Sequence, residues 1–359
     1  MKKILSLVLV LALCLSLFAG CGSDSSSDGY ELAFVTDVGT IDDQSFNQST
    51  YEGMLAWALD NDKTYKDYEP LSSSTTDLVD TMNVAIANGA KVIVAAGYVF
   101  PEAMTQVANE NPDVYFILCD SDTEMPSNCC SFSYNVEYAG FLAGYATVMD
   151  GYTSLAYIGG ISYPTVYNAG QGFMQGADAA AAELGITIDQ IYGHTGNFDE
   201  SAANKAMFTS IFSTGTEVLF SFGGSNTYSA YAAASEASPT RWIVTPDTDG
   251  TSQDATAYTS VMKELGYSVY SALDDIYNNN FAVYAGVNIV GIDEDMVGIP
   301  FENSKFTNFD ADDYATAVAL AKSTNVIVSS DANDAATAGD VDTFISELGL
   351  TNSNVTLWN

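Results

Sequence analysis

The sequence is poor in basic residues and contains a single histidine. Among its 359 residues, 10 are Lys or Arg and 46 are Asp or Glu, and His194 is the only histidine. A chain this acidic repels nucleic acid and anionic lipid headgroups, so a nucleic-acid partner is excluded. One histidine, with no ligand cluster around it, supports neither a metal site nor a Ser-His-Asp triad. We therefore expect no bound metal and no cofactor.

A phosphate-binding loop is also missing. Gly223 and Gly224 follow an apolar run, but no Gly-Lys-Ser or Gly-Lys-Thr comes after them, so nucleotide hydrolysis is not supported. The acidic run at 247–254 (DTDGTSQD) places its glycine too early for an EF-hand calcium loop.

Cysteine is scarce. Cys14 and Cys21 belong to the N-terminal segment, which leaves Cys119, Cys129 and Cys130 for the rest of the chain. Three is an odd number, so at most one internal disulfide can form, between Cys119 and one of the other two. Three buried free thiols are an equally supported alternative. If the segment around Cys129 and Cys130 is extended, their side chains point to opposite faces.

Residues 1–20 read as a secretory signal peptide. Two lysines precede a short apolar core and small residues, and the apolar stretch is too short for a membrane span. Residues 17–21 (LFAGC) resemble a bacterial lipobox, which implies that Cys21 is lipidated and anchors the protein to the membrane. The alternative is an ordinary signal with Cys21 as a spare thiol. Residues 21–29 form the lipidated cysteine and a flexible Ser/Gly/Asp tether. Removing residues 1–20 changes the formal charge from −36 to −38.

The remaining chain of about 330 residues is longer than one core usually covers, so we expect two domains. Strand and helix patterns alternate along it, which predicts parallel, doubly wound α/β sheets. The expected strands are 31–36, 91–96, 113–119, 155–158, 187–192, 217–222, 241–245 and 287–291. The expected helices are 76–88, 101–109, 137–149, 166–184, 267–278, 310–322 and 341–348, together with helices starting near 45, 201 and 226.

The loop between the first strand and the first helix is dense in polar side chains. It holds Asp37, Asp42 and Asp43, and Ser45 with Gln48 predicts a capping box that starts the helix at Ser45. The expected buried face of this helix comprises Phe46, Tyr51, Met54, Leu55, Ala58 and Leu59. Ligands of open α/β sheets bind at this carboxyl edge of the strands. The alternative is an ordinary turn whose acids only cap the helix.

Two further positions lie where strands end. Asp120 follows the strand at 113–119, and Phe198 stands just before a helix that Asp199 or Ser201 can cap. We expect Tyr98 and Phe100, at the mouth of another strand, to pack in the core.

The stretch 36–53 (TDVGTIDDQSFNQSTYEG) resembles the signature of the basic membrane protein (BMP, PnrA-like) substrate-binding lipoproteins of ABC transporters, several of which bind purine nucleosides. The resemblance covers about residues 30–291. It implies a type I periplasmic-binding-protein fold, in which two doubly wound α/β lobes, joined by crossover segments, close over a ligand cleft. The expected N-terminal lobe comprises residues 30–136 plus about 262–290, and the expected C-terminal lobe 137–261 plus about 291–359.

The resemblance also implies a set of ligand contacts. Phe46 and Phe198 would sandwich a base, and Asn47 would read its edge. Asp247 would accept hydrogen bonds from the two hydroxyls of a ribose, with Lys263 beside it. The full set of expected contacts is Asp37, Phe46, Asn47, Asp120, Phe198, Gly224, Asp247 and Lys263.

The function implied is that of an extracytoplasmic, lipid-anchored protein that captures a nucleoside, with a purine favoured, and delivers it to the permease and ATPase subunits of an ABC importer. A binding protein for a sugar or another small neutral ligand is one alternative, and a surface sensor with the same fold is another. An enzyme that uses Asp42 and Asp43 is a third. It is disfavoured because neighbouring side chains in a capped turn diverge and neither has an acid partner.

Overall fold

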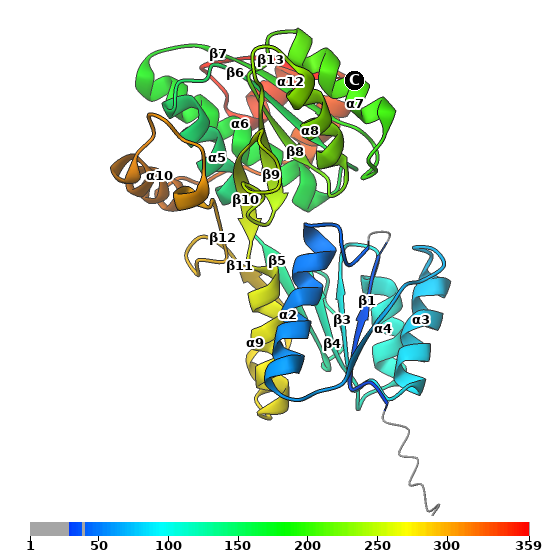
Figure 1. The fold of residues 1–359 in the computed structure, drawn as a ribbon. Helices are drawn as coiled ribbons and strands as arrows, with labels where there is room; N and C mark the ends of the chain where they lie inside the picture. Colours follow the sequence, from blue (N-terminus) through cyan, green and yellow to red (C-terminus); the bar gives the residue numbers. More distant parts are fainter. Residues whose placement is uncertain (1–28, 38–39, 359) are drawn as a thin grey trace, which may run out of the picture.

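The computed structural model describes residues 29–37 and 40–358, and the expected signal peptide, Cys21 and most of the tether lie outside them. Two α/β lobes stand one above the other in Figure 1. The lower, N-terminal lobe is built on a six-stranded parallel sheet of order β11-β5-β4-β3-β1-β2. Its strands are β1 (Leu32–Val35), β2 (Tyr65–Tyr68), β3 (Val92–Ala96), β4 (Tyr115–Cys119), β5 (Cys129–Tyr134) and β11 (Gly286–Val290).

Helices cover both faces of this sheet (Figure 1). Alternate residues of the strands point to opposite faces, so each strand contributes to two separate cores. One core includes Phe34 and Val94 with residues of α2 (Phe46–Asp60) and α9 (Leu265–Tyr277). The other includes Val35 and Ile93 with residues of α3 (Thr75–Ala87) and α4 (Pro101–Glu110).

The upper, C-terminal lobe is built on a seven-stranded sheet of order β12-β10-β9-β8-β6-β7-β13. Its strands are β6 (Ser154–Gly159), β7 (Ile188–His194), β8 (Val218–Phe222), β9 (Trp242–Asp247), β10 (Ala257–Lys263), β12 (Val297–Gly298) and β13 (Ser353–Trp358). All pairings are parallel except that of β10 with β12.

One face of this sheet packs on α7 (Ala202–Ser213) and α8 (Asn226–Glu236). The other packs on α5 (Glu137–Met149) and α6 (Pro164–Leu184), with α10 (Ala311–Ser323), α11 (Ser330–Ala338) and α12 (Val341–Leu348) around them. Short 3-10 turns, η1 (Phe281–Val283) and η2 (Phe301–Asn303), complete the described elements. The chain passes between the lobes after β5, after β10 and after β11.

Glycines let α5 and α6 touch along their backbones. A Cβ on Gly144 of α5 would lie 2.0 Å from the carbonyl oxygen of Phe173, and one on Gly176 of α6 would lie 2.0 Å from that of Phe141. Real Cβ atoms do not approach this closely, so larger residues would push the two helices apart. Because α5 is the first element after the chain leaves β5, this tight packing holds the start of the C-terminal lobe in place.

A similar glycine contact positions the segment after β10. A Cβ on Gly53 of α2 would lie 2.3 Å from the carbonyl oxygen of Gly266, at the start of α9. Because Gly266 is three residues after Lys263, this contact holds the segment that follows β10 against the middle of α2.

Several expectations about local structure are wrong. Leu59, expected on the buried face of the first helix, is 63% exposed, while Trp57 is buried. The sequence patterns also missed five strands and one α-helix: β2, β5, β10, β12, β13 and α11.

The disulfide alternative is also wrong, because Cys119, Cys129 and Cys130 are buried free thiols. In the register of β4 and β5, Cys119 lies opposite Phe132, while Cys129 lies opposite Phe116, so no two cysteines face each other. Cys129 and Cys130 point to opposite faces of the sheet, as an extended segment predicts.

Within residues 29–37 and 40–358, no helix is long and apolar enough to cross a membrane, and no cluster of three or more metal-ligating side chains occurs.

Candidate ligand-binding site

A cavity of about 150 Å³ lies between the two lobes, at the carboxyl ends of strands from both sheets. This is the edge at which ligands of parallel α/β sheets bind. All eight residues expected to contact ligand line this one cavity. They are Asp37, Phe46, Asn47, Asp120, Phe198, Gly224, Asp247 and Lys263.

The first turn of α2 is capped by Asp43. Its Oδ1 accepts from the backbone N–H groups of Ser45 and Gln48, at 2.9 and 3.1 Å, and its Oδ2 accepts from that of Asn47 at 2.9 Å. The expected capping by Ser45 is therefore wrong, because a carboxylate two residues earlier satisfies the free N–H groups more fully. Gln48 does turn back towards the start of the helix as a capping box requires, but its side-chain oxygen accepts from the backbone N–H of Gln44 instead of that of Ser45.

The same carboxylate orients Asn47. The Asn47 side-chain nitrogen donates to Asp43 Oδ2 at 3.2 Å and to Asp37 Oδ1 at 3.1 Å. Its Oδ1 is buried and has no hydrogen-bond partner among the described residues. A buried acceptor without a partner is costly unless a ligand or water completes it, so this oxygen is a ready acceptor for a ligand N–H.

Lys263 joins the acids of the two lobes. Its Nζ lies 2.6 Å from Asp120 Oδ2 and 2.9 Å from Asp247 Oδ1, and all three side chains are almost fully buried. Burial alone would lower the pKa of Lys263, but the charges of Asp120 and Asp247 raise it above its usual value. Burial raises the pKa of Asp120, against the lowering effect of the neighbouring Lys263. The three groups together carry one net negative charge when ionised.

Ser45 completes this arrangement from the other side. Its hydroxyl donates to Asp247 Oδ2 at 2.7 Å, so both carboxylate oxygens of Asp247 are engaged by the N-terminal lobe or by Lys263. A diol that bound Asp247 would replace or share these donors.

Two residues that line the cavity, and one in the loop beside it, have left-handed backbones although none of them is glycine. Gln44, Asp120 and Asp247 have φ values of +53°, +60° and +66°. This conformation is unfavourable for residues with a Cβ and persists where the surroundings impose it. At Asp120 and Asp247 it turns the side chains away from their strands and towards the cavity.

Aromatic rings line the cavity from both lobes. Phe46 comes from α2, and the Nζ of Lys263 lies 4.8 Å from its ring centroid. Phe198 comes from the loop before α7 and packs on Gly160, where a Cβ would lie 2.3 Å from its ring. Both rings are half-buried. Tyr98 and Tyr163, one from each lobe, stack with centroids 3.4 Å apart.

Ten further cavity residues were not in the expected set. They are Asp43, Gly97, Tyr98, Tyr163, Thr165, Val166, Asp199, Phe222, Gly223 and Ser225. Tyr98 was expected in the core, and that is wrong because its ring is half-buried at the cavity, whereas Phe100 is fully buried as expected. Tyr98 and Tyr163 each follow the end of a strand, so the strand-end rule that identified Asp120 applies to both of them.

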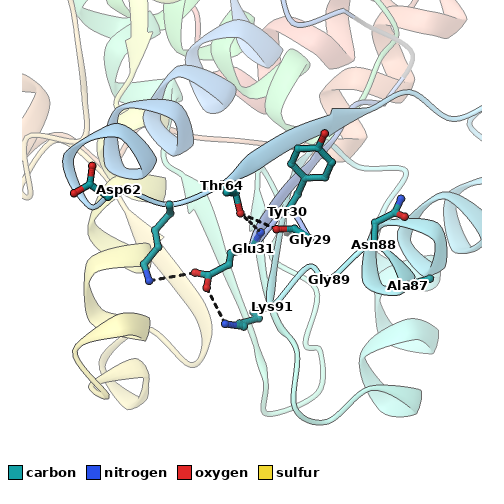
Figure 2. Close-up of a pocket in the computed structure, with 10 residues that line it drawn as sticks. Gly29, Tyr30, Glu31, Asp62, Thr64, Ala87, Asn88, Gly89 and Lys91 are labelled. Carbon is teal, nitrogen blue, oxygen red and sulfur yellow. Dashed lines mark hydrogen bonds and ion pairs between the residues drawn. The ribbon is translucent and has the colours of Figure 1, made fainter. Parts of the chain in front are cut away.

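A second, larger and more open cavity lies at the amino ends of β1 and β3, where the described chain begins (Figure 2). Glu31 sits there between Lys63 and Lys91, at 3.2 and 2.8 Å. The lysines lower the pKa of Glu31, Lys91 most strongly. The groups are paired with one another, and this end of a parallel sheet is not where α/β proteins bind ligands.

The family model described as "ABC transporter substrate-binding protein PnrA-like" matches residues 30–333. The chain belongs to this family, called Bmp. The recognition made from the 36–53 signature is thereby confirmed.

Curated relatives of this Bmp-family chain come from several bacteria. A "CD4+ T-cell-stimulating antigen" of Listeria innocua is 26% identical over 77% of this chain and 82% of its own length. An "ABC transporter nucleoside-binding protein BmpA" of Lactococcus lactis is 25% identical over 62% of this chain and 65% of its own. "Basic membrane protein B" of Borreliella burgdorferi is 25% identical over 80% and 86%.

Solved structures confirm the fold of this Bmp-family chain. An ABC transporter solute-binding protein from Aeropyrum pernix matches with a TM-score of 0.72 at 16% identity, over 89% of this chain and 99% of the other. One from Conexibacter woesei matches with a TM-score of 0.63 at 18% identity, over 82% and 95%. The expected type I periplasmic-binding-protein fold is therefore correct. As a substrate-binding protein of an ABC transporter, the Bmp-family protein acts outside the cytoplasm and delivers a small molecule to its transporter.

Proposed function

We propose that the cavity between the lobes captures an uncharged nucleoside, with a purine favoured, for import. The observation that carries this proposal is the combination, in one cavity, of half-buried Phe46 and Phe198 from opposite lobes with the carboxylate of Asp247. Stacking on an aromatic ring contributes about 1–3 kcal/mol per base. The two acceptor oxygens of a carboxylate match the two hydroxyls of a ribose.

The charge of the cavity disfavours a phosphorylated cargo. Lys263 is the one basic residue among the described residues that line it, and five aspartates line it as well. The charge of Lys263 is already shared between Asp120 and Asp247. A nucleotide would bring its phosphate into an excess of negative charge, and it would find no free cation there.

Asn47 supplies the base-reading group in this proposal. Its unpartnered Oδ1 accepts a hydrogen bond, while its amide nitrogen is held by Asp37 and Asp43. An acceptor fixed in this way favours a ligand edge with an N–H group. The relative named as a nucleoside-binding protein is consistent with a cargo of this class.

The protein binds and releases its cargo without changing it. Asp43, the acid nearest to the start of α2, uses both oxygens on N–H groups, and burial raises its pKa. Asp42 is exposed, accepts from Thr40 and is not among the residues that line the cavity. Neither acid is therefore available as a general acid or base, and incubation with nucleosides should release no free base.

Lipid on Cys21 holds the protein at the outer surface of the cell membrane in this proposal, and residues 22–29 give it reach. Residues 22–28 lie outside the described residues, so the support is the 17–21 motif in the sequence. Cells fed an alkyne-labelled fatty acid should label the wild-type protein and not Cys21→Ser. Equal labelling of both would remove the anchor from the proposal.

A thermal-shift screen of the purified protein tests the cargo. Adenosine, guanosine, inosine and uridine would be compared with ribose, free bases and AMP. A ligand that binds only the folded protein stabilises it by about 2.7 kcal/mol at one hundred times its Kd. We expect a shift with purine nucleosides and none with AMP. Stabilisation by ribose and by no nucleoside would replace the proposal with a sugar cargo.

A further inference from the structure

A second group of contacts joins the lobes outside the ligand cavity. It involves the backbone of residues 43 and 44, between β1 and α2, and three side chains of the C-terminal lobe. Gln253 Nε2 donates to the carbonyl oxygen of Gln44 at 2.8 Å, and Thr248 Oγ1 donates to the same oxygen at 3.4 Å. The hydroxyl of Tyr228 donates to the carbonyl oxygen of Asp43 at 3.3 Å.

The donors of these contacts do not line the cavity. Tyr228, Thr248 and Gln253 are absent from its walls, whereas their acceptors belong to the loop that shapes it. Tyr228 and Gln253 instead border a small separate pocket with Gln44 and Ser45. A change at these three donors therefore leaves the ligand contacts in place.

The acceptors are held in position by the site itself. Gln44 has a left-handed backbone, with φ of +53°, and its N–H donates to Gln48 of α2. Asp43 is bound to the first turn of α2 through its carboxylate. The two carbonyl groups thus move with Asn47 and with the N-terminal lobe.

We propose that Tyr228, Thr248 and Gln253 form a closure latch, which sets how long the lobes stay shut over any cargo without reading its chemistry. The latch residues are positioning residues: they bind the opposite lobe and hold the walls of the cavity at the right separation. The inference rests on lobe closure over a ligand, which the proposed function shares, and not on the identity of the cargo.

The sharpest single change is Gln253→Glu. It removes the Nε2 donor but keeps an acceptor for the hydroxyl of Tyr231, which donates to Gln253 Oε1 at 3.3 Å. Tyr228→Phe and Thr248→Val remove the other two donors with little change in volume. Gln44→Ala is the matched control, because Gln44 contributes its backbone carbonyl to the latch and Ala has the same difficulty at positive φ.

The experiment measures Kd and dissociation rates for two ligands that bind the wild-type protein. One net hydrogen bond corresponds to about a fivefold change in affinity, so Gln253→Glu should raise both Kd values about fivefold. The triple variant, which combines Gln253→Glu, Tyr228→Phe and Thr248→Val, should raise them further. The change should lie in the dissociation rate, and the ratio of the two Kd values should stay constant. Gln44→Ala should match the wild type. Unchanged dissociation rates in the triple variant, or a change confined to one ligand, would overturn the latch.

Small-angle scattering of the protein without ligand provides a readout that does not depend on cargo. The triple variant should have a larger radius of gyration than the wild type and Gln44→Ala, at a similar melting temperature. If the screen finds no nucleoside that binds, the proposed function fails and this comparison still decides the latch. Equal radii would then overturn it.

Discussion

The ammonium nitrogen of Lys263, at the end of β10 in the C-terminal sheet, lies 2.6 Å from the carboxylate of Asp120, which follows β4 in the N-terminal sheet. The pair spans the two lobes and shares its cation with Asp247. Because these side chains are buried, solvent screens their charges much less than it screens the charges of a surface ion pair. The two charges can therefore stay paired only while the lobes keep this separation.

Replacing Lys263 with Met should destabilise the protein strongly. The change leaves Asp120 and Asp247 buried and without their cation, and removal of one partner from a buried ion pair costs about 3–5 kcal/mol. Urea unfolding at pH 7 measures the loss. Lys322→Met is the matched control, since Lys322 pairs at 3.5 Å with the exposed Asp293 and should cost less than about 1 kcal/mol. Equal losses for the two variants would show that the buried contacts of Lys263 with Asp120 and Asp247 make no special contribution to stability.

Replacing Phe198 with Ala should weaken cargo binding more than it weakens folding. The half-buried ring faces the cavity and rests on Gly160, so its loss removes a stacking surface worth about 1–3 kcal/mol per base. Titration calorimetry with the best nucleoside of the screen should show about a 5- to 150-fold rise in Kd. Phe281→Ala, at η1 and away from the cavity, should leave Kd unchanged. An effect of Phe281→Ala as large as that of Phe198→Ala would argue against base stacking.

His194 should make the protein less stable in acid. Its ring packs against Gly159, where a Cβ would lie 2.6 Å from Nδ1. Desolvation lowers the pKa of His194 from its usual value of 6.5 to about 4. The unfolded chain therefore binds a proton between these pH values and the folded chain does not. The stability that His194 contributes is complete above pH 6.5 and falls by up to about 3 kcal/mol as the pH drops towards 4.

The variant His194→Asn isolates this effect. Glu137, whose pKa is raised to about 7 by burial, changes stability in the opposite sense over part of the same range, so only the difference between variant and wild type is informative. Chemical denaturation at pH 7.5 and pH 4.5 should show that the variant loses less stability on acidification. Parallel losses would mean that His194 is protonated in the folded protein.

Replacing Gly144 with Ala should disrupt the contact of α5 with α6. The new Cβ would meet the backbone carbonyl of Phe173, which cannot move without shifting the helix, so we expect a loss of about 3 kcal/mol or more. Gly298→Ala is the control, because no atom lies within 4 Å of a Cβ there, and it should change stability by less than about 0.5 kcal/mol. Thermal unfolding compares them. A tolerated Gly144→Ala would show that the helices can separate freely.

The long elements with clear periodicity were predictable from the sequence. The helices expected at 137–149 and 341–348 have those bounds in the structure. The second of them begins after Asp340, whose side chain caps it. Two of the edge strands, β2 and β13, were not predictable. Strand β2 reads Tyr-Lys-Asp-Tyr and is largely exposed, and β13 alternates half-buried with exposed residues, so neither shows the apolar run of a central strand.

Site residues were predictable where they stand at the end of an expected strand. Asp120 and Asp247 end strands, and the ends of parallel strands meet at one edge. The partners of these residues were not predictable. Ser45 was expected to cap α2 but instead bonds Asp247, 202 residues away, because Asp43 already occupies the N–H groups of the helix. Competition between two nearby caps depends on contacts from the other lobe, which no local pattern contains.

The most direct test of the account is titration calorimetry of Asp247→Asn and wild-type protein with one purine ribonucleoside and its 2′-deoxy analogue. Asp247 lies at the cavity with its carboxylate between Ser45 and Lys263, where we propose that it holds the ribose hydroxyls. We expect that the wild-type protein prefers the ribonucleoside and that Asp247→Asn binds the two more nearly alike. Equal affinity of the wild-type protein for both nucleosides, or no binding of either, would contradict it.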